Sequence, residues 1–182
     1  MACTAPRDSL AEAIRSSGLV DERSSGVALC SGGGDSAALL AGLAGVCGPE
    51  RVLALHLNYG LRPDSGEDER CCRALCERLG VELVVERPEL PTEGNLQAAA
   101  RDARYSAAEG LRRERGLDWI ASGHTRTDLA ETVVYRLATS PGRRALLGLA
   151  PQRGRVIRPL LGLGRRQVRA LEVELRQTLF VR

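Results

Sequence analysis

The sequence predicts an α/β fold, in which a doubly wound, mostly parallel sheet carries helices on both faces. Apolar segments of strand length alternate with helix-length amphipathic segments along the chain, an order typical of parallel sheets. The segment at residues 52–58 is almost continuously apolar, which suits a strand buried on both faces. A length of 182 residues is enough for one such domain with a core on each side of the sheet.

The chain begins with a predicted short amphipathic helix, residues 8–17, which ends at Gly18. The first strand is expected near residues 27–30, and another helix follows it. We therefore divide the chain into an N-terminal helical segment, residues 1–24, and an α/β domain, residues 25–182.

The later elements continue the alternation. Ser65 and Asp68 form a predicted capping box for a helix that Gly80 closes, and Asn95 is the predicted N-cap of a helix that runs to about Arg115. The other expected elements are strands 52–58, 81–86, 117–122 and 156–158, and helices 127–138 and 165–176.

Three segments, Ser31, residues 56–59 and residues 123–124, each follow directly on a predicted strand. Ligands of open parallel sheets bind beyond the carboxyl ends of the strands. We therefore expect these segments to converge on one crevice.

The loop after the first strand reads Ser31-Gly32-Gly33-Gly34-Asp35-Ser36. Consecutive glycines let backbone N–H groups approach an anion without a Cβ in the way, and the next helix points the positive end of its dipole at the same place. The serine hydroxyls add donors, and Asp35 adds a carboxylate for a Mg²⁺ ion that bridges phosphates. The loop therefore predicts a phosphate site; the alternative is a glycine-rich turn without a ligand.

Two other kinds of phosphate loop are excluded by residue type. A Walker loop needs Lys after its last glycine, and the chain contains no Lys. A dinucleotide-binding fingerprint needs a third glycine three residues after its second, and none stands there.

The net charge of +3 hides an uneven distribution. Residues 141–182 carry ten Arg against two acidic residues, a balance of +8, so residues 1–140 total −5. A basic end on an acidic body predicts contact with a polyanion, and a solvated arginine-rich surface is the alternative.

Six cysteines and an N-terminus without a hydrophobic signal core predict a cytoplasmic protein with free thiols. The longest uncharged stretch, residues 36–49, is too short to span a bilayer. Cys71, Cys72 and Cys76 lack the paired spacing of a tetrahedral metal site, so we interpret them as packed, unreactive thiols.

Two groups of ionisable residues have helical spacing. His124, Asp128 and Glu131 would share one side of a helix and could bind Mg²⁺, polarise a base or hold a cationic amine; alternatively, the carboxylates complement the helix dipole. Arg101 and Arg104 lie three apart on the preceding helix and could bind phosphates; solvated helix arginines are the alternative.

The glycine loop resembles the S-G-G-x-D-S signature of the PP-loop ATP pyrophosphatases, with all five fixed positions matched. The chain also resembles tRNA(Ile)-lysidine synthetase over about residues 25–165, because further segments occur in that family's order. Those segments are His56-Leu57-Asn58-Tyr59-Gly60-Leu61-Arg62, Asn95-Leu96-Gln97 with Ala100-Arg101-Asp102-Ala103-Arg104-Tyr105, Gly123-His124 with Asp128 and Ala130-Glu131-Thr132, and Arg158-Pro159-Leu160-Leu161. The resemblance implies an adenine nucleotide alpha hydrolase-like fold.

The resemblance implies a ligase that works in two steps with ATP and Mg²⁺. ATP would adenylate the C2 carbonyl oxygen of the wobble cytidine in a CAU-anticodon tRNA(Ile), with release of pyrophosphate. The amine of L-lysine would then attack C2 and expel AMP. The implied partners are this tRNA and L-lysine, without a membrane, and a homodimer is an assembly to test.

The resemblance also implies roles for individual residues. Residues 31–36 would bind ATP, with Asp35 as catalytic residue and Mg²⁺ ligand. His124 would lie near the reacting centre, and Arg104 would stabilise the phosphates or the activated base. The substrate residues would be Arg101, for the same phosphates or base, and Asp128 and Glu131, for the charged lysine.

The chain departs from that family at several positions. Tyr59, Thr127 and Leu129 stand where the family often has His, Asp and Gln. The chain stops at Arg182, before the family's further motif and helical tRNA-binding regions, so we expect domain 25–182 to be truncated at its C-terminal end.

Three other functions remain open. A PP-loop tRNA thiolase would need a C-x-x-C pair or a sulfur-carrying cysteine, and no such pair is present. An amidotransferase synthetase would need a source of ammonia, and the sequence shows no glutaminase half. The last alternative is an ATP-binding module without turnover.

Overall fold

The computed structural model describes residues 6–61, 65–91, 93–139 and 145–180. Within these residues, six strands form one sheet in the order β3-β2-β1-β4-β6-β5, parallel at every pairing except that of β5 with β6. The predicted mostly parallel α/β class is therefore confirmed. The strands are β1 (Gly26–Leu29), β2 (Val52–Leu57), β3 (Glu82–Glu86), β4 (Trp119–Ala121), β5 (Gln152–Arg153) and β6 (Val156–Ile157).

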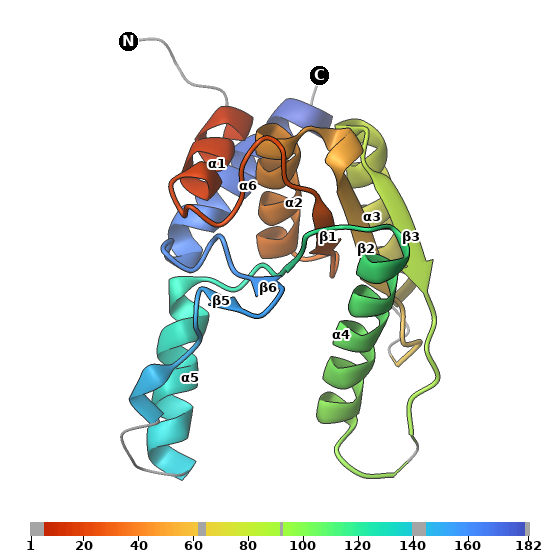
Figure 1. Cartoon of the computed structure of the whole chain (residues 1–182), viewed down its shortest axis with the longest axis vertical. Helices are drawn as coiled ribbons and strands as arrows, with labels where there is room; N and C mark the ends of the chain where they lie inside the picture. The colour runs from red at the N-terminus through yellow and green to blue at the C-terminus, as the bar shows by residue number, and fades with distance from the viewer. Residues whose placement is uncertain (1–5, 62–64, 92, 140–144, 181–182) are drawn as a thin grey trace.

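Helices cover both faces of the sheet. α1, α2 and α6 pack together at one end of the molecule, whereas α4 and α5 extend separately from the other end (Figure 1). α3 lies against β3 and β2, and α4 contacts β1 and β4. The helices are α1 (Pro6–Arg15), α2 (Gly34–Cys47), α3 (Ser65–Leu79), α4 (Leu96–Glu114), α5 (Arg126–Thr139) and α6 (Arg165–Phe180), with short 3₁₀ helices η1 (Pro49–Arg51) and η2 (Ala145–Leu147).

The sheet has a hydrophobic core on each face. Ala28 of β1 faces the larger core, which is formed with α1, α2, α3 and α6. Val27 and Leu29 face the smaller core, which includes Ala108 and Leu111 of α4. Successive side chains of a strand point to opposite faces, so β1 is buried at every position.

α1 packs on α2 at Gly42. A Cβ there would lie 2.6 Å from Ile14 Cδ1, so a larger residue would push the two helices apart. Leu10 and Ile14 of α1 are fully buried. The N-terminal helix is therefore an integral part of the larger core.

Several predicted helix ends agree with the structure. Asn95 is the N-cap of α4, and its Oδ1 accepts a hydrogen bond of 3.1 Å from the Ala98 N–H. Gly18 and Gly80 have φ of +67° and +71°, as expected of residues that follow a helix. Ser65, however, is the first residue of α3 rather than the capping residue before it.

The β5–β6 hairpin was not predicted from the sequence. β5 is two exposed polar residues, so it has no hydrophobic pattern. It pairs antiparallel with β6 through a turn that contains Gly154 at φ +60°. α6 runs past its predicted end at residue 176 to Phe180. No helix in the described part of the chain has the length and hydropathy that crossing a membrane requires.

Candidate active site

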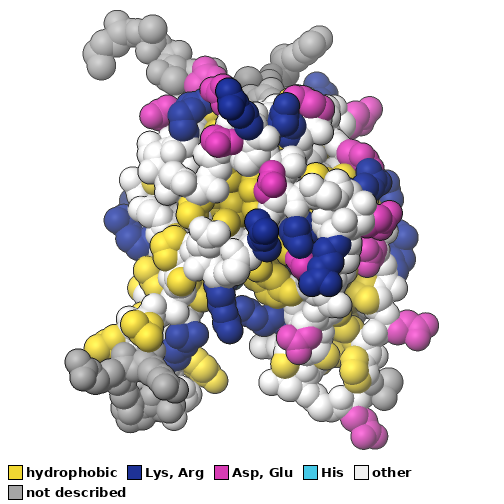
Figure 2. Space-filling model, viewed as in Figure 1, with side chains coloured by type: hydrophobic (Ala, Val, Ile, Leu, Met, Phe, Trp, Pro, Cys, Tyr) yellow, Lys and Arg dark blue, Asp and Glu magenta, His cyan; other side chains and the backbone are white. Residues whose placement is uncertain are grey.

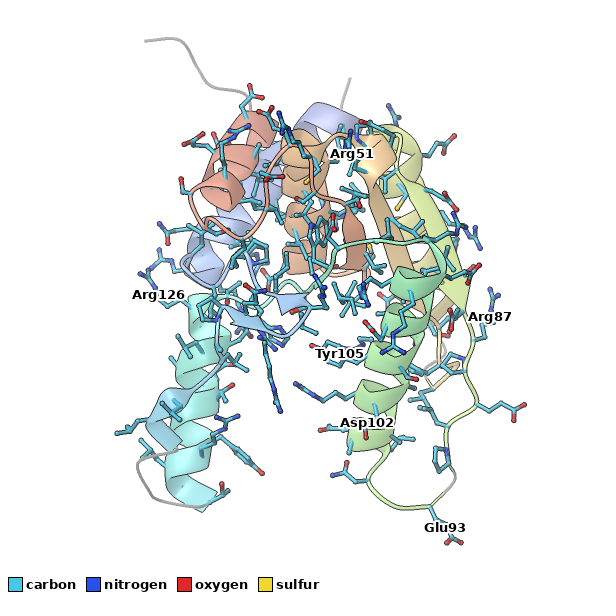
Figure 3. The ribbon with its side chains drawn as sticks, in the orientation of Figure 1. Arg51, Arg87, Glu93, Asp102, Tyr105 and Arg126 are labelled. Carbon is cyan, nitrogen blue, oxygen red and sulfur yellow. The ribbon has the colours of Figure 1, made fainter. Side chains whose placement is uncertain are left out.

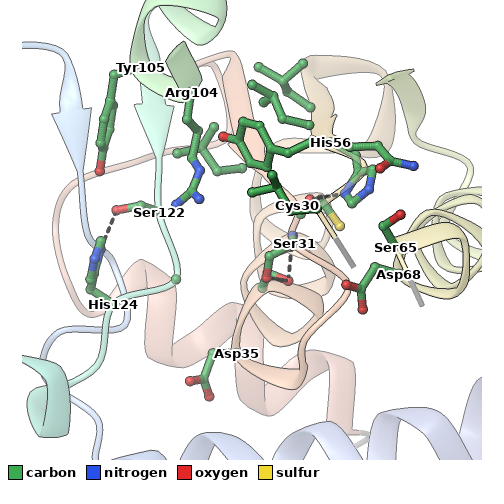
Figure 4. Close-up of a pocket in the computed structure, with 18 of the residues that line it drawn as sticks. Cys30, Ser31, Asp35, His56, Ser65, Asp68, Arg104, Tyr105, Ser122 and His124 are labelled. Carbon is green, nitrogen blue, oxygen red and sulfur yellow. Dashed lines mark hydrogen bonds between the residues drawn. The ribbon is translucent and has the colours of Figure 1, made fainter. Parts of the chain in front are cut away.

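A cavity of about 410 Å³ lies beyond the carboxyl ends of β1, β2 and β4 (Figure 4). Ser31, residues 56–59 and residues 123–124 all line it, so their predicted convergence is confirmed. Other polar or ionisable side chains of the lining are Cys30, Asp35, Ser36, Ser65, Asp68, Arg104, Tyr105, Ser122 and Asp128.

The phosphate loop, residues 31–36, is held in shape by its own hydrogen bonds. The Ser31 N–H donates to Ser36 Oγ at 3.1 Å, and the Ser36 hydroxyl donates to the Gly33 carbonyl oxygen at 2.8 Å. Gly32 has φ +87°, and a Cβ there would lie 3.0 Å from Asp68 of α3. The glycine is required both by the backbone conformation and by the closeness of α3.

The loop ends at an open helix N-terminus. Gly33 is the N-cap of α2, with an extended backbone and no side-chain capping hydrogen bond. The first N–H groups of α2 therefore have no side-chain cap, the arrangement that binds anions at helix N-termini. This geometry supports the prediction of a phosphate site.

Gly123 lets the loop after β4 approach the phosphate loop. A Cβ on Gly123 would lie 3.0 Å from the Asp35 carbonyl oxygen and 3.3 Å from the Ser36 nitrogen. A side chain at this position would therefore push the two loops apart. The close approach brings His124 and Asp128 to the same cavity as the phosphate loop.

Asp128 and Glu131 of α5 bind one guanidinium, that of Arg165 at the start of α6. Arg165 Nη2 lies 2.6 Å from Asp128 Oδ1, and Nη1 lies 3.1 Å from Glu131 Oε1. Its Nε lies 3.9 Å from Asp35 Oδ2. We call Asp128, Glu131 and Arg165 the acidic cluster. Sequence analysis missed Arg165. A signal was available, because a basic residue in the first turn of a helix is unfavourable with the helix dipole and indicates that a carboxylate lies nearby.

The carboxylates of this region have different pKa values. Burial, and then the negative charge of Asp128, raise the pKa of Asp35. Burial also acts to raise the pKa of Asp128, but two hydrogen bonds from Thr125 and the charge of Arg165 lower it overall. The Thr125 N–H and hydroxyl donate to Asp128 Oδ2 at 2.7 and 2.8 Å. Asp128 is therefore a stabilised anion, whereas Asp35 lacks enough positive charge around it.

The Asp35 carboxylate, which lines the cavity, fits the needs of a nucleotide-bound Mg²⁺ ion. Such an ion takes one or two protein carboxylates and completes its shell with phosphate oxygens and water. A divalent cation would relieve the repulsion that raises the pKa of Asp35. Among the described residues, no three His, Cys, Asp or Glu side chains form a metal site by themselves.

His124 lines the cavity just after β4, and its Nδ1 lies 2.9 Å from Ser122 Oγ (Figure 4). Burial lowers the pKa of His124, and the positive charges of Arg158, Arg101 and Arg104 lower it further. The buried Arg158 belongs to the Arg-Pro-Leu-Leu segment and donates from Nη1 to the Ala150 carbonyl oxygen at 2.7 Å. Because the pKa of His124 is lowered, its imidazole is neutral near pH 7.

Arg101 and Arg104 of α4 have different surroundings. Arg104 lines the cavity. Arg101 does not; its guanidinium lies 5.4 Å from the ring centroid of Tyr105. Tyr105 lies on the side of α4 that faces α5 (Figure 3). Glu131 also lies outside the cavity lining, with an exposed side chain that binds Arg165.

The loop after β2 is positioned by a residue that sequence analysis missed. Glu69 of α3 is buried and accepts a hydrogen bond from Asn58 Nδ2 at 3.1 Å. It also forms ion pairs with Arg73 and Arg87 at 2.8 and 2.7 Å. These interactions, the Asn58 hydrogen bond most of all, lower the pKa of Glu69 to about 2. A buried glutamate has no signal in a single sequence.

Basic side chains gather on one face of the molecule. Figure 2 shows dark-blue arginines over the centre of this face and above the space between the projecting α4 and α5. Arg153 and Arg155 of the β5–β6 hairpin are exposed. The polyanion contact remains a prediction, with a solvated arginine-rich surface as its alternative.

A family model described as a PP-loop domain matches residues 6–181. Among curated proteins, the tRNA(Ile)-lysidine synthase of Thermus thermophilus is 42% identical over 145 residues, which is 77% of this chain and 28% of that protein. That of Deinococcus radiodurans is 40% identical over 143 residues, 76% of this chain and 24% of that protein. The chain thus spans about a quarter of the length of these relatives.

Two solved structures have the same fold. The U34-tRNA thiolase NcsA of Methanococcus maripaludis superposes with a TM-score of 0.75 at 17% identity, over 96% of this chain and 64% of that chain. The NH3-dependent NAD synthetase of Campylobacter jejuni superposes with a TM-score of 0.60 at 22% identity, over 96% and 73%. At these identities the likeness concerns the fold alone.

Proposed function

The chain belongs to the PP-loop domain family, and on this premise we propose that it binds ATP and uses it to join L-lysine to the wobble cytidine of a CAU-anticodon tRNA(Ile). The observation that carries the proposal is the single cavity that the phosphate loop shares with Arg104, His124 and Asp128. Two curated relatives that match 77% and 76% of this chain are named tRNA(Ile)-lysidine synthases.

The phosphate loop would bind the triphosphate of ATP. The N–H groups at the start of α2, which have no side-chain cap, supply donors around one point, and the hydroxyls of Ser31 and Ser36 hold the loop in shape through their own hydrogen bond. Asp35 would hold Mg²⁺, which offsets the charge that develops on the departing pyrophosphate. Arg104 approaches from α4 and would place a fixed positive charge beside the reacting phosphate.

Adenylation would begin when the C2 carbonyl oxygen of cytidine attacks the α-phosphorus of ATP, which forms an O–P bond and releases pyrophosphate. The lysine amine would then attack C2, and AMP would leave with the former carbonyl oxygen. His124 is neutral near pH 7 because burial and nearby arginines lower its pKa. It would therefore accept a proton from the attacking amine.

Asp128 and Glu131 would hold the positively charged end of lysine. The way they bind Arg165 supports this role, because two carboxylates with these positions already hold one cationic side chain. Lysine would share or replace these contacts. Assembly as a homodimer and a cytoplasmic location remain predictions.

The proposal is tested with ATP, L-lysine and an unmodified CAU-anticodon tRNA, with pyrophosphate release and lysidine formation as readouts. We expect pyrophosphate release that requires the tRNA, repeated turnover and lysidine formation that also require lysine, and a loss of at least a hundredfold with Asp35→Ala. Asp8→Ala, which removes an exposed carboxylate of α1, is the control and should be unchanged. Pyrophosphate release supported equally by a sulfide donor without lysine would contradict the proposal. ATP binding without turnover would instead indicate a binding module.

A further inference from the structure

The sulfur atoms of Cys30 and Cys72 lie 3.3 Å apart beside the phosphate loop. Cys30 immediately precedes Ser31 (Figure 4), and Cys72 projects from α3. The two residues are only 4% and 1% exposed. The prediction of packed thiols is confirmed for Cys72 and Cys76, but it is wrong for Cys71, which is exposed.

We propose that Cys30 and Cys72 form an oxidation site for hydroperoxides, and that the disulfide they form weakens ATP binding at the phosphate loop. The oxidation itself does not depend on the proposed function. Its effect on ATP rests on the proposed function.

A second cavity gives a small oxidant a place next to both sulfurs. It has a volume of about 240 Å³ and is lined by Cys30, Cys71 and Cys72 together with Leu175 and Leu179 of α6. Cys30 also lines the candidate active site. The cysteine pair therefore lies between the two cavities, and a hydrogen peroxide molecule is small enough to occupy the second one while the first holds a nucleotide.

Cys30 is the better nucleophile of the pair. The hydrogen bond with Cys72 lowers the pKa of Cys30 against the effect of burial, and the Gly32 N–H and Ser36 hydroxyl act in the same direction. The same hydrogen bond and burial raise the pKa of Cys72. The thiolate is the reactive form of cysteine, so Cys30 attacks first and Cys72 second.

The reaction balances with peroxide as the only oxidant. The Cys30 thiolate attacks one oxygen of hydrogen peroxide, the O–O bond breaks, and the departing hydroxide takes a proton and leaves as water. The resulting sulfenic acid is attacked by the Cys72 sulfur, the S–O bond breaks, and a second water leaves as the S–S bond forms. Two thiols lose two electrons, and one peroxide gains them.

The disulfide would change the phosphate loop. Its formation brings the sulfurs from 3.3 Å to about 2.05 Å, which draws Cys30 and α3 together. The phosphate loop runs close to α3, since a Cβ added at Gly32 would lie 3.0 Å from Asp68, so the movement would shift the loop. In the disulfide, Cys30 is no longer a thiolate, so the interactions by which the Gly32 N–H and the Ser36 hydroxyl favour that thiolate are lost. We therefore expect the Kd for ATP to rise about tenfold.

The experiment uses the full chain with Cys47→Ala and Cys71→Ser, so that the tryptic peptides 24–51 and 71–73 each contain one cysteine. The protein is treated with hydrogen peroxide, and the disulfide is identified by mass spectrometry before and after reduction with dithiothreitol. ATP affinity is measured on the same samples by calorimetry. We expect a link between Cys30 and Cys72, a Kd about ten times higher, and recovery of both after reduction.

The matched variants are Cys72→Ser and Cys76→Ser, which change neighbouring buried thiols of the same helix. Cys72→Ser should abolish the link and the sensitivity of ATP binding to peroxide, whereas Cys76→Ser should keep both. Oxidation of Cys30 to a sulfinic acid without a link would overturn the proposal, as would a link that leaves the Kd within twofold. Reduced protein that binds no ATP would contradict the proposed function alone, because the mass measurement reports the disulfide independently.

Discussion

The phosphate loop and Asp128 of the acidic cluster line the same cavity, but the loop and the cluster are held in place by different interactions. The phosphate loop comprises six consecutive residues whose shape depends on backbone conformation and short hydrogen bonds within the loop. The acidic cluster joins α5 to α6 through ion pairs with the partly exposed Arg165. Exposed ion pairs contribute only about 0–1 kcal/mol each.

This difference indicates which part of the site can change when ligands bind. The phosphate loop has close neighbours, because a Cβ added at Gly32 would lie 3.0 Å from Asp68 of α3 and one added at Gly123 would lie 3.0 Å from the Asp35 carbonyl oxygen. The acidic cluster can exchange Arg165 for another cation at a small cost in free energy. We therefore expect the proposed nucleotide side to be preformed and the proposed amine side to be adjustable.

Gly123→Val tests the preformed side at its closest contact and should have the largest effect. The new side chain would meet the backbone of Asp35, where even a Cβ lies 3.0 Å from the carbonyl oxygen. We expect the Kd for ATP, measured by calorimetry, to rise roughly a hundredfold, the upper range for overpacking. Gly110→Ala, at a position with open space, is the control. Unchanged ATP affinity would show that the loop can rearrange.

Asp128→Asn and Glu131→Gln distinguish the proposed amine side from the nucleotide side, because we expect them to change lysine binding and to leave ATP binding unchanged. Asp128 lines the cavity and is fixed by Thr125, whereas Glu131 is exposed and outside the lining. We expect the KM for lysine to rise about tenfold for Asp128→Asn and about threefold for Glu131→Gln. Steady-state kinetics with tRNA would test this order. A larger effect of Glu131→Gln would reverse the assignment.

Arg165→Met tests whether the amine side is adjustable. Without the guanidinium, Asp128 and Glu131 lose a cation that competes with lysine, so the KM for lysine should fall about threefold, a size typical of exposed ion pairs. Arg166→Met, which changes the next exposed arginine, is the control. A higher KM would instead make Arg165 a residue that positions the two carboxylates.

The smallest effect concerns pH. Because burial and nearby arginines lower the pKa of His124 below 6.5, the neutral imidazole persists at pH 6.5 and is lost only as the pH falls further. We expect kcat for lysidine formation to change less than twofold between about pH 6.5 and 8 and to decline below this range. His124→Gln should lower kcat and remove this decline. A decline that persists in His124→Gln would assign it to another group.

Much of the nucleotide side could be predicted from the sequence. Residues 31–36 lie between an apolar strand and a helix, and each property that makes them a phosphate site is local. The segments after β2 and β4 could be placed at the same cavity because the carboxyl ends of parallel strands share one edge of the sheet. The roles assigned to their side chains remain predictions.

The residues that could not be predicted act over long distances in the chain. Arg165 reaches Asp128 across 37 positions, and Cys30 reaches Cys72 across 42. Glu69 supports Asn58 from a helix that reads as an ordinary amphipathic segment. Neither the spacing of residues along the chain nor the amino-acid composition indicates such contacts.

The sequence by itself determined the fold class, the phosphate loop and the edge of the sheet at which the site forms. Those features depend on hydrophobic pattern, glycine conformation and strand direction, which are properties of neighbouring residues. Only the tertiary structure decided which charge faces Asp128, which residue holds the loop after β2, and which sulfur lies beside Cys30. Side-chain contacts between distant segments depend on how helices pack against the sheet, and that packing is a property of the whole core.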